Sequence, residues 1–295
     1  MFDGEEHEGY YTQEQIKDVV AYAASKYINV VPEIEMPGHA LAALASYPEL
    51  SFDSTQTYKV SPTWGVFEQV FCPSETTFKF FEGVMDEVVE LFPSEYIHIG
   101  GDECPKTAWK NSAFCQQLIR QLGLKDDVTP SKVDGVKHSK EDKLQSYFVT
   151  RMEKYLNGKG RNIIGWDEIL EGGLAPNATV MSWRGVEGGL NAAKAGHNAI
   201  MTPMPYAYLD FYQEDPAIAP TTIGGYTTLK KTYSYNPAPD DADELVKKHV
   251  IGMQGNIWRE YMKNSDRTDY QAFPRAMAIA ETGWTLDANI MAGRD

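Results

Sequence analysis

Cysteine, basic charge and long apolar runs are all scarce in this sequence. The 295 residues include 3 cysteines, and 27 Lys and Arg stand against 42 Asp and Glu, for a formal net charge of −15. Three cysteines are too few and too oddly numbered for a disulfide framework. The acidic balance argues against a nucleic-acid partner or an anionic membrane surface, because either would need a dense patch of Lys and Arg.

Apolar residues make up 42% of the chain. No uninterrupted apolar run approaches the roughly 20 residues that a membrane helix requires, so we expect a globular protein without a membrane partner. The opening stretch MFDGEEHEGY also lacks the cationic and apolar pattern of an export signal. At this length a single domain covering residues 1–295 is expected.

Helical patterns alternate with short apolar runs along the chain. Thr12 is an N-cap candidate for a helix over 12–27, whose apolar residues recur at helical spacing. Further helices are predicted over 76–93, 143–160, 188–195 and 241–250, and strands are predicted to begin near Ile28, Tyr96, Asn162, Ala178, Asn198 and Ile251. Such alternation implies parallel strands joined by right-handed crossovers. Both a closed barrel and an open sheet fit this pattern.

Polar and aromatic residues fall at or just beyond the C-terminal ends of these strands. They are His39, Asp102, Asp167, Trp183, Asp210 and Trp258. In a (β/α)8 barrel all those ends meet on one face, where the active site is built, whereas an open sheet would spread them along a line. We therefore predict an α/β fold, a TIM-type (β/α)8 barrel, in which only about six of the eight strands are recognisable.

The stretch YIHIGGDEC, residues 96–104, places two adjacent carboxylates directly after a buried strand. Asp102 and Glu103 repel each other when both are ionised, so burying them together raises the pKa of at least one and provides a proton donor near neutral pH. The chain must turn after Gly101 for both acids to reach one substrate, and Gly100 and Gly101 permit that turn. GGDE alone is more often a solvated surface turn, so its context decides.

Three of the predicted strand ends carry tryptophan beside polar residues: GWDE at Trp166, SWRG at Trp183, and NIW at Trp258, followed by Glu260. Indole faces pack on the apolar faces of sugar rings, and carboxylates accept hydrogen bonds from hydroxyls, so the combination suggests a carbohydrate site. Any one tryptophan could equally be a large core residue. Three at strand ends weaken that interpretation.

The ordered set of motifs resembles glycoside hydrolase family 20, the β-N-acetylhexosaminidases. The resemblance runs through YTQEQIKDVVAYAASKYINVVPEIEMPGHALA, IHIGGDE, NIIGWDEIL, VMSWRG, YLD and GNIWREY, in that order, and covers most of the chain. It implies exo-acting hydrolysis of terminal β-linked N-acetylglucosamine or N-acetylgalactosamine with retention, in which the substrate's own acetamido oxygen attacks the anomeric carbon. It also implies an N-acetylhexosamine-containing oligosaccharide or glycan as partner, no cofactor or metal, and an extracytoplasmic location.

The resemblance implies catalytic roles for the two adjacent acids. Glu103 would protonate the leaving oxygen and later deprotonate water, and Asp102 would stay ionised and orient the acetamido N–H. His39, in MPGH, would support the acid/base carboxylate.

The remaining roles concern substrate binding. The resemblance implies that Trp166, Trp183 and Trp258 wall the acetamido group and sugar ring, that Tyr208 hydrogen-bonds the acetamido oxygen, and that Asp210 and Glu260 hold sugar hydroxyls. Trp109, Asp167 and Glu168 also stand near strand ends and receive no role.

Two other classes of function remain open from the residues themselves. Asp102, Glu103, His39 and Asp167 could ligate a divalent metal in a metal-dependent hydrolase, although HxH and HExxH spacings are absent from the sequence. A non-catalytic sugar-binding module or a catalytically impaired barrel fragment would also use the aromatic residues. A pure binding site, however, has no need of a carboxylate pair that costs electrostatic energy.

Two strands of the expected eight are missing from the pattern. In family 20 two strands precede the region matching Tyr10 and bring a sugar-binding arginine and an aspartate that partners the PGH histidine. Neither has a counterpart in this chain, so the barrel is expected to be incomplete at its N-terminus. Unpaired edges at the strands near Ile28 and Ile251 would then require covering, by a separate N-terminal piece or by a homo-oligomer.

Overall fold

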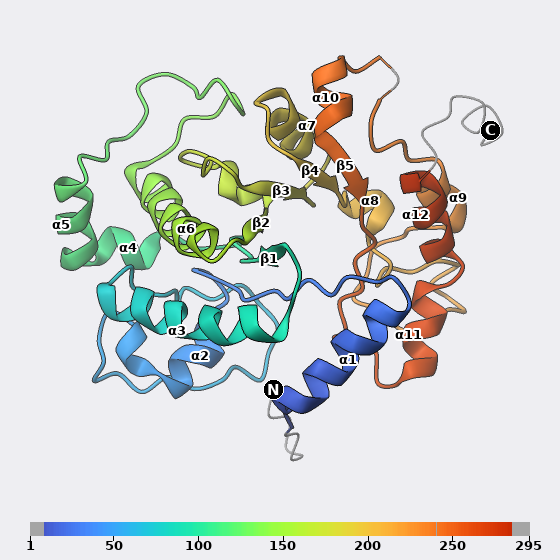
Figure 1. Ribbon diagram of the computed structural model, residues 1–295, viewed down its shortest axis with the longest axis horizontal. Helices are drawn as coiled ribbons and strands as arrows, with labels where there is room; N and C mark the ends of the chain where they lie inside the picture. The colour runs from blue at the N-terminus through green and yellow to red at the C-terminus, as the bar shows by residue number, and fades with distance from the viewer. Residues whose placement is uncertain (1–8, 240, 285–295) are drawn as a thin grey trace. The chain divides into compact units, whose positions relative to one another are not determined.

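The computed structural model describes residues 9–239 and 241–284 (Figure 1). It divides into two compact units, Met1–Ala178 and Thr179–Asp295, each of which we describe by itself. Helices and short parallel strands alternate in both, which confirms the predicted α/β class.

The first unit begins with α1 (Gln13–Ser25), whose N-cap is Thr12 as the sequence predicts. Thr12 and Gln15 form a capping box, in which each side chain accepts a hydrogen bond from the other residue's backbone N–H. The unit continues with α2 (Leu41–Ser46), η1 (Pro48–Leu50), α3 (Glu75–Leu91), β1 (Tyr96–His98), α4 (Thr107–Asn111), α5 (Ala113–Gln121), α6 (Lys140–Gly158), β2 (Asn162–Trp166) and η2 (Asp167–Leu170).

Strands β1 and β2 pair in parallel, with Tyr96 opposite Asn162 and His98 opposite Ile164. The helices α3 and α6 pack against each other, as Figure 1 shows. Ile97, Ile99 and Ile163 are fully buried, because both faces of these strands are covered. The carboxyl end of β1 is thereby held rigidly where the Gly100–Gly101 turn begins.

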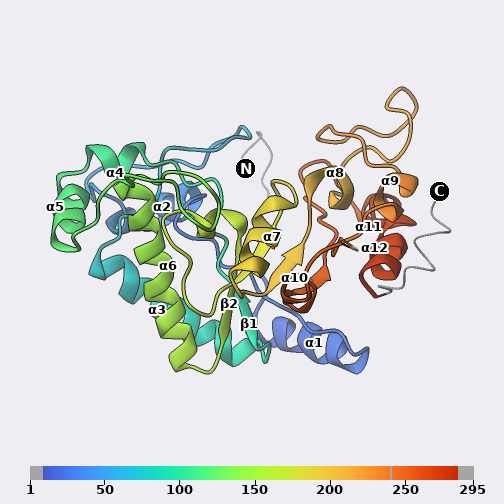
Figure 2. The ribbon, with the colours of Figure 1, turned by 90° about the horizontal axis from the view of Figure 1, so that it is seen from above.

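The second unit contains β3 (Thr179–Ser182), α7 (Glu187–Lys194), β4 (Ala199–Met201), α8 (Met204–Ala207), α9 (Leu229–Tyr233), α10 (Glu244–His249), β5 (Val250–Met253), α11 (Ser265–Ala272) and α12 (Arg275–Trp284). Strand β4 pairs in parallel with both β3 and β5. Helix α12 packs against α9 and α11, and Figure 2 shows the three in one group. The core of this unit includes Ala207, Leu209 and Ile279, and it anchors the segment that follows β4.

Five of the six predicted strands form, and the sixth, near Ile28, does not. Its segment meets β1 at a single bridge, Glu33 opposite His98. Among the described residues of this unit only β1 pairs with it, and Ile28 and Val31 are exposed. At the other predicted edge, Ile251 of β5 is 48% exposed. Three backbone hydrogen bonds still join the segment to the end of β1: the N–H of His98 donates to Pro32, and the N–H groups of Ile34 and Met36 donate to His98 and Ile99. Pro32 has no N–H of its own to donate, so the ladder stays short.

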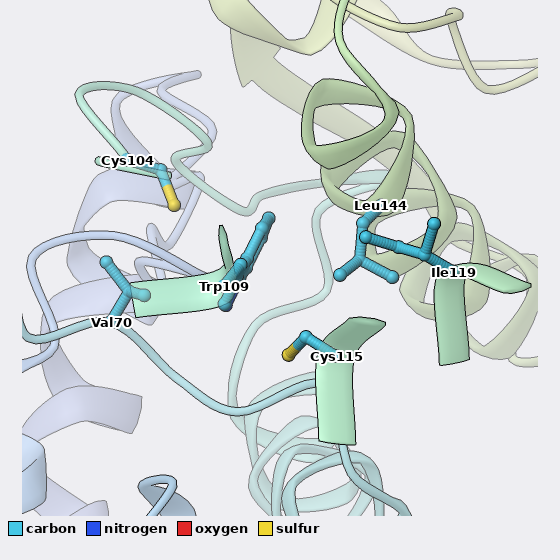
Figure 3. Packing of buried hydrophobic residues seen from close by; sticks show 6 residues of the cluster. All are labelled: Val70, Cys104, Trp109, Cys115, Ile119 and Leu144. Carbon is cyan, nitrogen blue, oxygen red and sulfur yellow. The ribbon is translucent and has the colours of Figure 1, made fainter. Parts of the chain in front are cut away.

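Trp109 is a core residue. It is fully buried beside Val70, Cys104 and Cys115 (Figure 3), and its indole N–H donates to the carbonyl of Phe71 at 3.1 Å. All three cysteines are free and buried. Within the described residues, no helix has the length and apolar content needed to cross a bilayer.

Candidate active site

The two adjacent acids stand on a sharp turn at the end of β1. Gly100 and Gly101 have φ values of +67° and +95°, which confirms that the chain turns through the glycines. Glu103 also lies in the left-handed region, at φ +43°, where a non-glycine residue is strained. The carbonyl of Gly101 accepts a hydrogen bond of 2.7 Å from the buried amide of Gln145 on α6. Helix α6 therefore fixes the turn.

His39 joins the two acids. Its Nε2 lies 3.3 Å from Asp102 Oδ2 and 3.4 Å from Glu103 Oε2. A hydrogen bond to Asp102 and the negative charges of Asp102, Glu103 and Glu168 raise the pKa of His39, against an opposing effect of burial. His39 has φ +46°, so the strained backbone positions of this unit include both the histidine and the acid/base candidate.

A third carboxyl, Glu35, lies against Asp102 and was missed by the sequence interpretation. Its Oε1 accepts a hydrogen bond of 3.1 Å from the N–H of Gly101. Desolvation, followed by the charge of Asp102 and a hydrogen bond to it, raises the pKa of Glu35 well above its ordinary value. The raised pKa favours the protonated form of Glu35, whose hydroxyl can donate to the carboxylate of Asp102.

Asp102 responds in the opposite direction. Burial opposes its ionisation, but hydrogen bonds from His39 and Glu35 outweigh burial and lower the pKa of Asp102. The sequence predicted a raised pKa within the Asp102–Glu103 pair. For Asp102 the direction is the opposite, and the carboxyl whose pKa is raised beside it is Glu35.

Glycine at position 100 makes room for Glu35. A Cβ built there would overlap the Glu35 carboxylate, and the positive φ adds strain of its own. The GGDE motif thus needs its first glycine for a contact with a residue 65 positions earlier in the chain, in addition to the turn.

Trp166 ends β2 beside this turn. Its backbone N–H donates to the carbonyl of Gly100 at 2.8 Å, and its indole N–H donates to Glu33 Oε1 at 2.9 Å. The ring is 3% exposed and packs on His98, with centroids 4.8 Å apart. Asp167 and Glu168 follow on η2 and are buried.

The second unit holds a separate group of predicted residues, which we call the tyrosine cluster: Trp183, Tyr208 and Asp210. The rings of Trp183 and Tyr208 lie 6.4 Å apart at 32°. Tyr208 forms a parallel bridge with Asn256, which brings the segment carrying Trp258 alongside. Trp258 is 40% exposed, so part of its ring is accessible to a ligand.

Asp210 is an almost fully buried acid, 4% exposed, whose Oδ1 has no hydrogen-bond partner among the described residues. Desolvation raises the pKa of Asp210 to about 7, the charge of Glu260 adds to the rise, and Arg275 opposes it. Glu260 itself is exposed. A buried carboxyl oxygen without a partner is suited to a ligand hydroxyl.

The structure thus brings His39, Asp102 and Glu103 together in the first unit, with Trp166 beside their turn. It brings Trp183, Tyr208, Asp210 and Glu260 into a second group, with Trp258 on the neighbouring segment. Trp109 belongs to the core. Glu35 carried one signal in the sequence, its place in EIEMPGH just before the histidine motif.

The first group can do two kinds of chemistry. An imidazole whose pKa is raised, an acid held ionised and a second acid 36% exposed can move a proton to and from a bound substrate. The ligand atoms of His39, Asp102 and Glu103 also lie within 4.8 Å of one another, close enough to hold a metal ion.

The chain is similar in sequence to proteins of known activity. The profile of "Glycosyl hydrolase family 20, catalytic domain" matches residues 1–287. A beta-hexosaminidase of Porphyromonas gingivalis is 50% identical over 96% of this chain and 35% of its own length. A beta-hexosaminidase of Vibrio furnissii is 36% identical over 98% of this chain and 45% of its own length.

Solved structures give the same result. A crystal structure of a beta-N-acetylhexosaminidase matches with a TM-score of 0.81 and 30% identity, over 99% of this chain and 61% of that one. The Vibrio harveyi GH20 exo beta-N-acetylglucosaminidase in complex with N-acetylglucosamine matches with a TM-score of 0.79 and 32% identity, over 98% of this chain and 44% of that one. The chain therefore spans between 35% and 61% of the lengths of these relatives.

Proposed function

The chain belongs to glycosyl hydrolase family 20, and from this premise we propose that it removes terminal β-linked N-acetylglucosamine or N-acetylgalactosamine from a glycan, as a retaining exo-β-N-acetylhexosaminidase. The observation that carries the proposal is the contact of His39 with both Asp102 and Glu103 at the end of β1.

The chemistry begins with two movements at the glycosidic bond. The substrate's acetamido oxygen attacks the anomeric carbon while Glu103 gives its proton to the departing oxygen, so the C–O bond breaks and an oxazolinium ion forms. Glu103 then takes a proton from a water molecule, whose oxygen attacks the same carbon from the side of the departed group. Two inversions give retention. The partial exposure of Glu103 supports this role, because both leaving group and water must reach it.

Asp102 stabilises the intermediate. Its carboxylate accepts a hydrogen bond from the acetamido N–H and opposes the positive charge that develops on the new ring. This role requires an ionised acid in a largely dry place, a combination that desolvation resists. The proton on Glu35 and the imidazole of His39 supply the hydrogen bonds that hold the pKa of Asp102 low.

We assign substrate binding to the other predicted residues. Trp183 and Tyr208 of the tyrosine cluster provide aromatic surface and a phenol for the sugar and its acetamido group. Trp166, predicted as a further wall, is 3% exposed and instead backs the turn that carries the two acids. The unpartnered Oδ1 of Asp210 and the exposed Glu260 suit sugar hydroxyls.

Chromogenic β-GlcNAc and β-GalNAc glycosides test the proposal. We expect hydrolysis of at least one, with a β-configured product seen first by NMR. An α-configured product would refute the mechanism. Asp102→Asn should lose turnover on every substrate, and Glu103→Gln should lose it on alkyl glycosides, whose leaving group needs a proton. A Glu103→Gln variant that loses this turnover but still binds N-acetylglucosamine would separate the enzyme from a pure sugar-binding module.

The metal-dependent hydrolase is the second candidate, because His39, Asp102 and Glu103 could ligate an ion. One simple experiment distinguishes the two candidate functions. Treatment with a chelator followed by desalting should leave glycoside hydrolysis unchanged if the substrate's acetamido group does the work. Loss of activity that returns with a divalent cation would favour the metal enzyme.

We also propose that the exposed segment at Ile28 and the exposed strand β5 are covered in the working protein. Ile28 in the first unit and Ile251 in the second are 59% and 48% exposed. Sedimentation of this chain distinguishes a homo-oligomer from a monomer. Comparison of its hydrolysis rate with that of an N-terminally extended version tests whether a preceding segment supplies the cover.

A further inference from the structure

Among the described residues of the second unit, Arg275 is the most deeply buried charged side chain, with 0% exposure. Its two terminal nitrogens donate to four carbonyls. Nη1 bonds Phe211 at 3.2 Å and Thr227 at 2.8 Å, and Nη2 bonds Leu209 at 2.6 Å and Gln271 at 2.7 Å. A buried guanidinium is costly unless such dipoles surround it, so this arrangement specifies the backbone around it.

Gln271 lies four residues before Arg275 and is 1% exposed. Its amide nitrogen donates to the carbonyl of Asp210 at 2.9 Å and, more weakly, to that of Phe211 at 3.4 Å. Together Gln271 and Arg275 hold the three consecutive carbonyls of residues 209–211, and we call this pair the carbonyl clamp.

The other side of the same segment is also fixed. The N–H of Leu209 donates to Asn256 at 2.7 Å, and the N–H of Asn256 donates to Ala207 at 2.8 Å. In an extended strand successive carbonyls point in opposite directions, so three that converge on one pair of side chains require a turn. The chain does turn after Tyr208, at Leu209 and Asp210.

We propose that the carbonyl clamp is a positioning device for substrate binding, which sets the directions of Tyr208 and Asp210 by holding the turn between them. This proposal rests on the proposed function, in which Tyr208 meets the acetamido group and Asp210 meets a sugar hydroxyl. Gln271 and Arg275 touch backbone carbonyls, so they act through that turn. The geometry explains how a carboxyl oxygen without a partner stays aimed in one direction.

Two substitutions disturb the clamp without changing its charge. Arg275→Lys keeps a cation, but an ammonium has three donors and cannot span four carbonyls in the plane of a guanidinium. Gln271→Met removes the amide donors and keeps the side-chain length. Arg267→Lys is the matched control. Arg267 bonds the carbonyls of Pro220 and Thr221 at 2.8 and 2.9 Å, in a segment that carries no assigned residue.

The experiment measures kcat and KM for a chromogenic β-GlcNAc glycoside, together with thermal unfolding of every variant. We expect Arg275→Lys and Gln271→Met to raise KM about tenfold with a smaller fall in kcat, because a ligand contact is misplaced. Arg267→Lys should match the wild type. In a double-mutant cycle, Arg275→Lys added to Asp210→Asn should cost less than about twofold more, because both act on one contact.

Three results would overturn the inference. A folded Arg275→Lys or Gln271→Met with wild-type KM would show that the turn needs no clamp. Losses that multiply with Asp210→Asn would show an independent, general effect on the fold. Failure of the wild type to hydrolyse any N-acetylhexosaminide would instead refute the proposed function, and the clamp's role in it. If Arg275→Lys does not fold, Gln271→Met and its double mutant with Asp210→Asn carry the test.

Discussion

Replacing Glu35 with Gln should reduce the fall in stability with rising pH between pH 4.5 and 6.5, the ordinary pKa values of Glu and His. Desolvation and the Asp102 charge raise the pKa of Glu35 well above 4.5. Above that pH the folded protein keeps a proton that the unfolded chain has lost. The free energy of unfolding therefore falls as pH rises towards the folded pKa.

The magnitude follows from one proton. A full difference of one bound proton changes the free energy of unfolding by about 1.4 kcal/mol per pH unit. Asp102 does not interfere, because its pKa is lowered from 3.8 and its stabilisation is lost only as pH falls below that value. The raised pKa of His39 adds a loss of the same sign, but only above 6.5. Asp210, whose pKa is raised to about 7, adds a loss of the same sign throughout this window, so the contribution of Glu35 is the difference in slope between the wild type and Glu35→Gln.

Gln is the right substitute because it copies the protonated acid. Its amide can donate to Asp102 while its oxygen accepts from the N–H of Gly101, and it cannot ionise. Urea unfolding at several pH values in this window measures the effect. Glu87→Gln, exposed on α3, controls for the change in formal charge. If wild type and Glu35→Gln keep parallel stability curves, the proton is not on Glu35 and the account of the Asp102 pKa is wrong.

Three further predictions concern the same turn. Gly100→Ala should destabilise the protein by about 1–3 kcal/mol more than Gly123→Ala, as measured by urea unfolding. Both glycines have φ +67°, but only at position 100 would a Cβ meet the buried carboxyl of Glu35. Glu103→Gln should retain far more activity on an aryl glycoside whose leaving group needs no protonation than on an alkyl glycoside, and equal losses would refute its role as acid. Asp102→Asn should lower the pKa of His39, because the hydrogen bond between the two residues is the main cause of its rise. An NMR titration in which the pKa of the imidazole is unchanged by the substitution would contradict the assignment.

Several elements of the fold followed from local patterns. Thr12 caps α1 where the sequence predicts it, because a capping box involves residues only three apart. Five parallel strands followed from their apolar runs. The strand expected near Ile28 is reduced to one bridge with β1, because Pro32 has no N–H with which to extend the ladder.

Parts of the candidate site could also be predicted from local patterns, and other parts could not. Asp102 and Glu103 could be found from the sequence alone, since two adjacent acids after a strand and two glycines form a local signal. His39 and the sugar-binding roles came from family resemblance, and the contact of His39 with both acids emerged only when the chain was folded. The roles of the tyrosine cluster stay predictions.

The sequence by itself therefore determined the residue types that could do acid/base chemistry and the turn on which they stand. Only the tertiary structure decided their charge states and directions. Glu35 meets Gly101 across 66 residues, and Gln271 meets Asp210 across 61. A pKa depends on how much water and which charges surround a group, and a turn depends on what its carbonyls bond. Both are properties of neighbours in space, which folding brings together from distant parts of the chain.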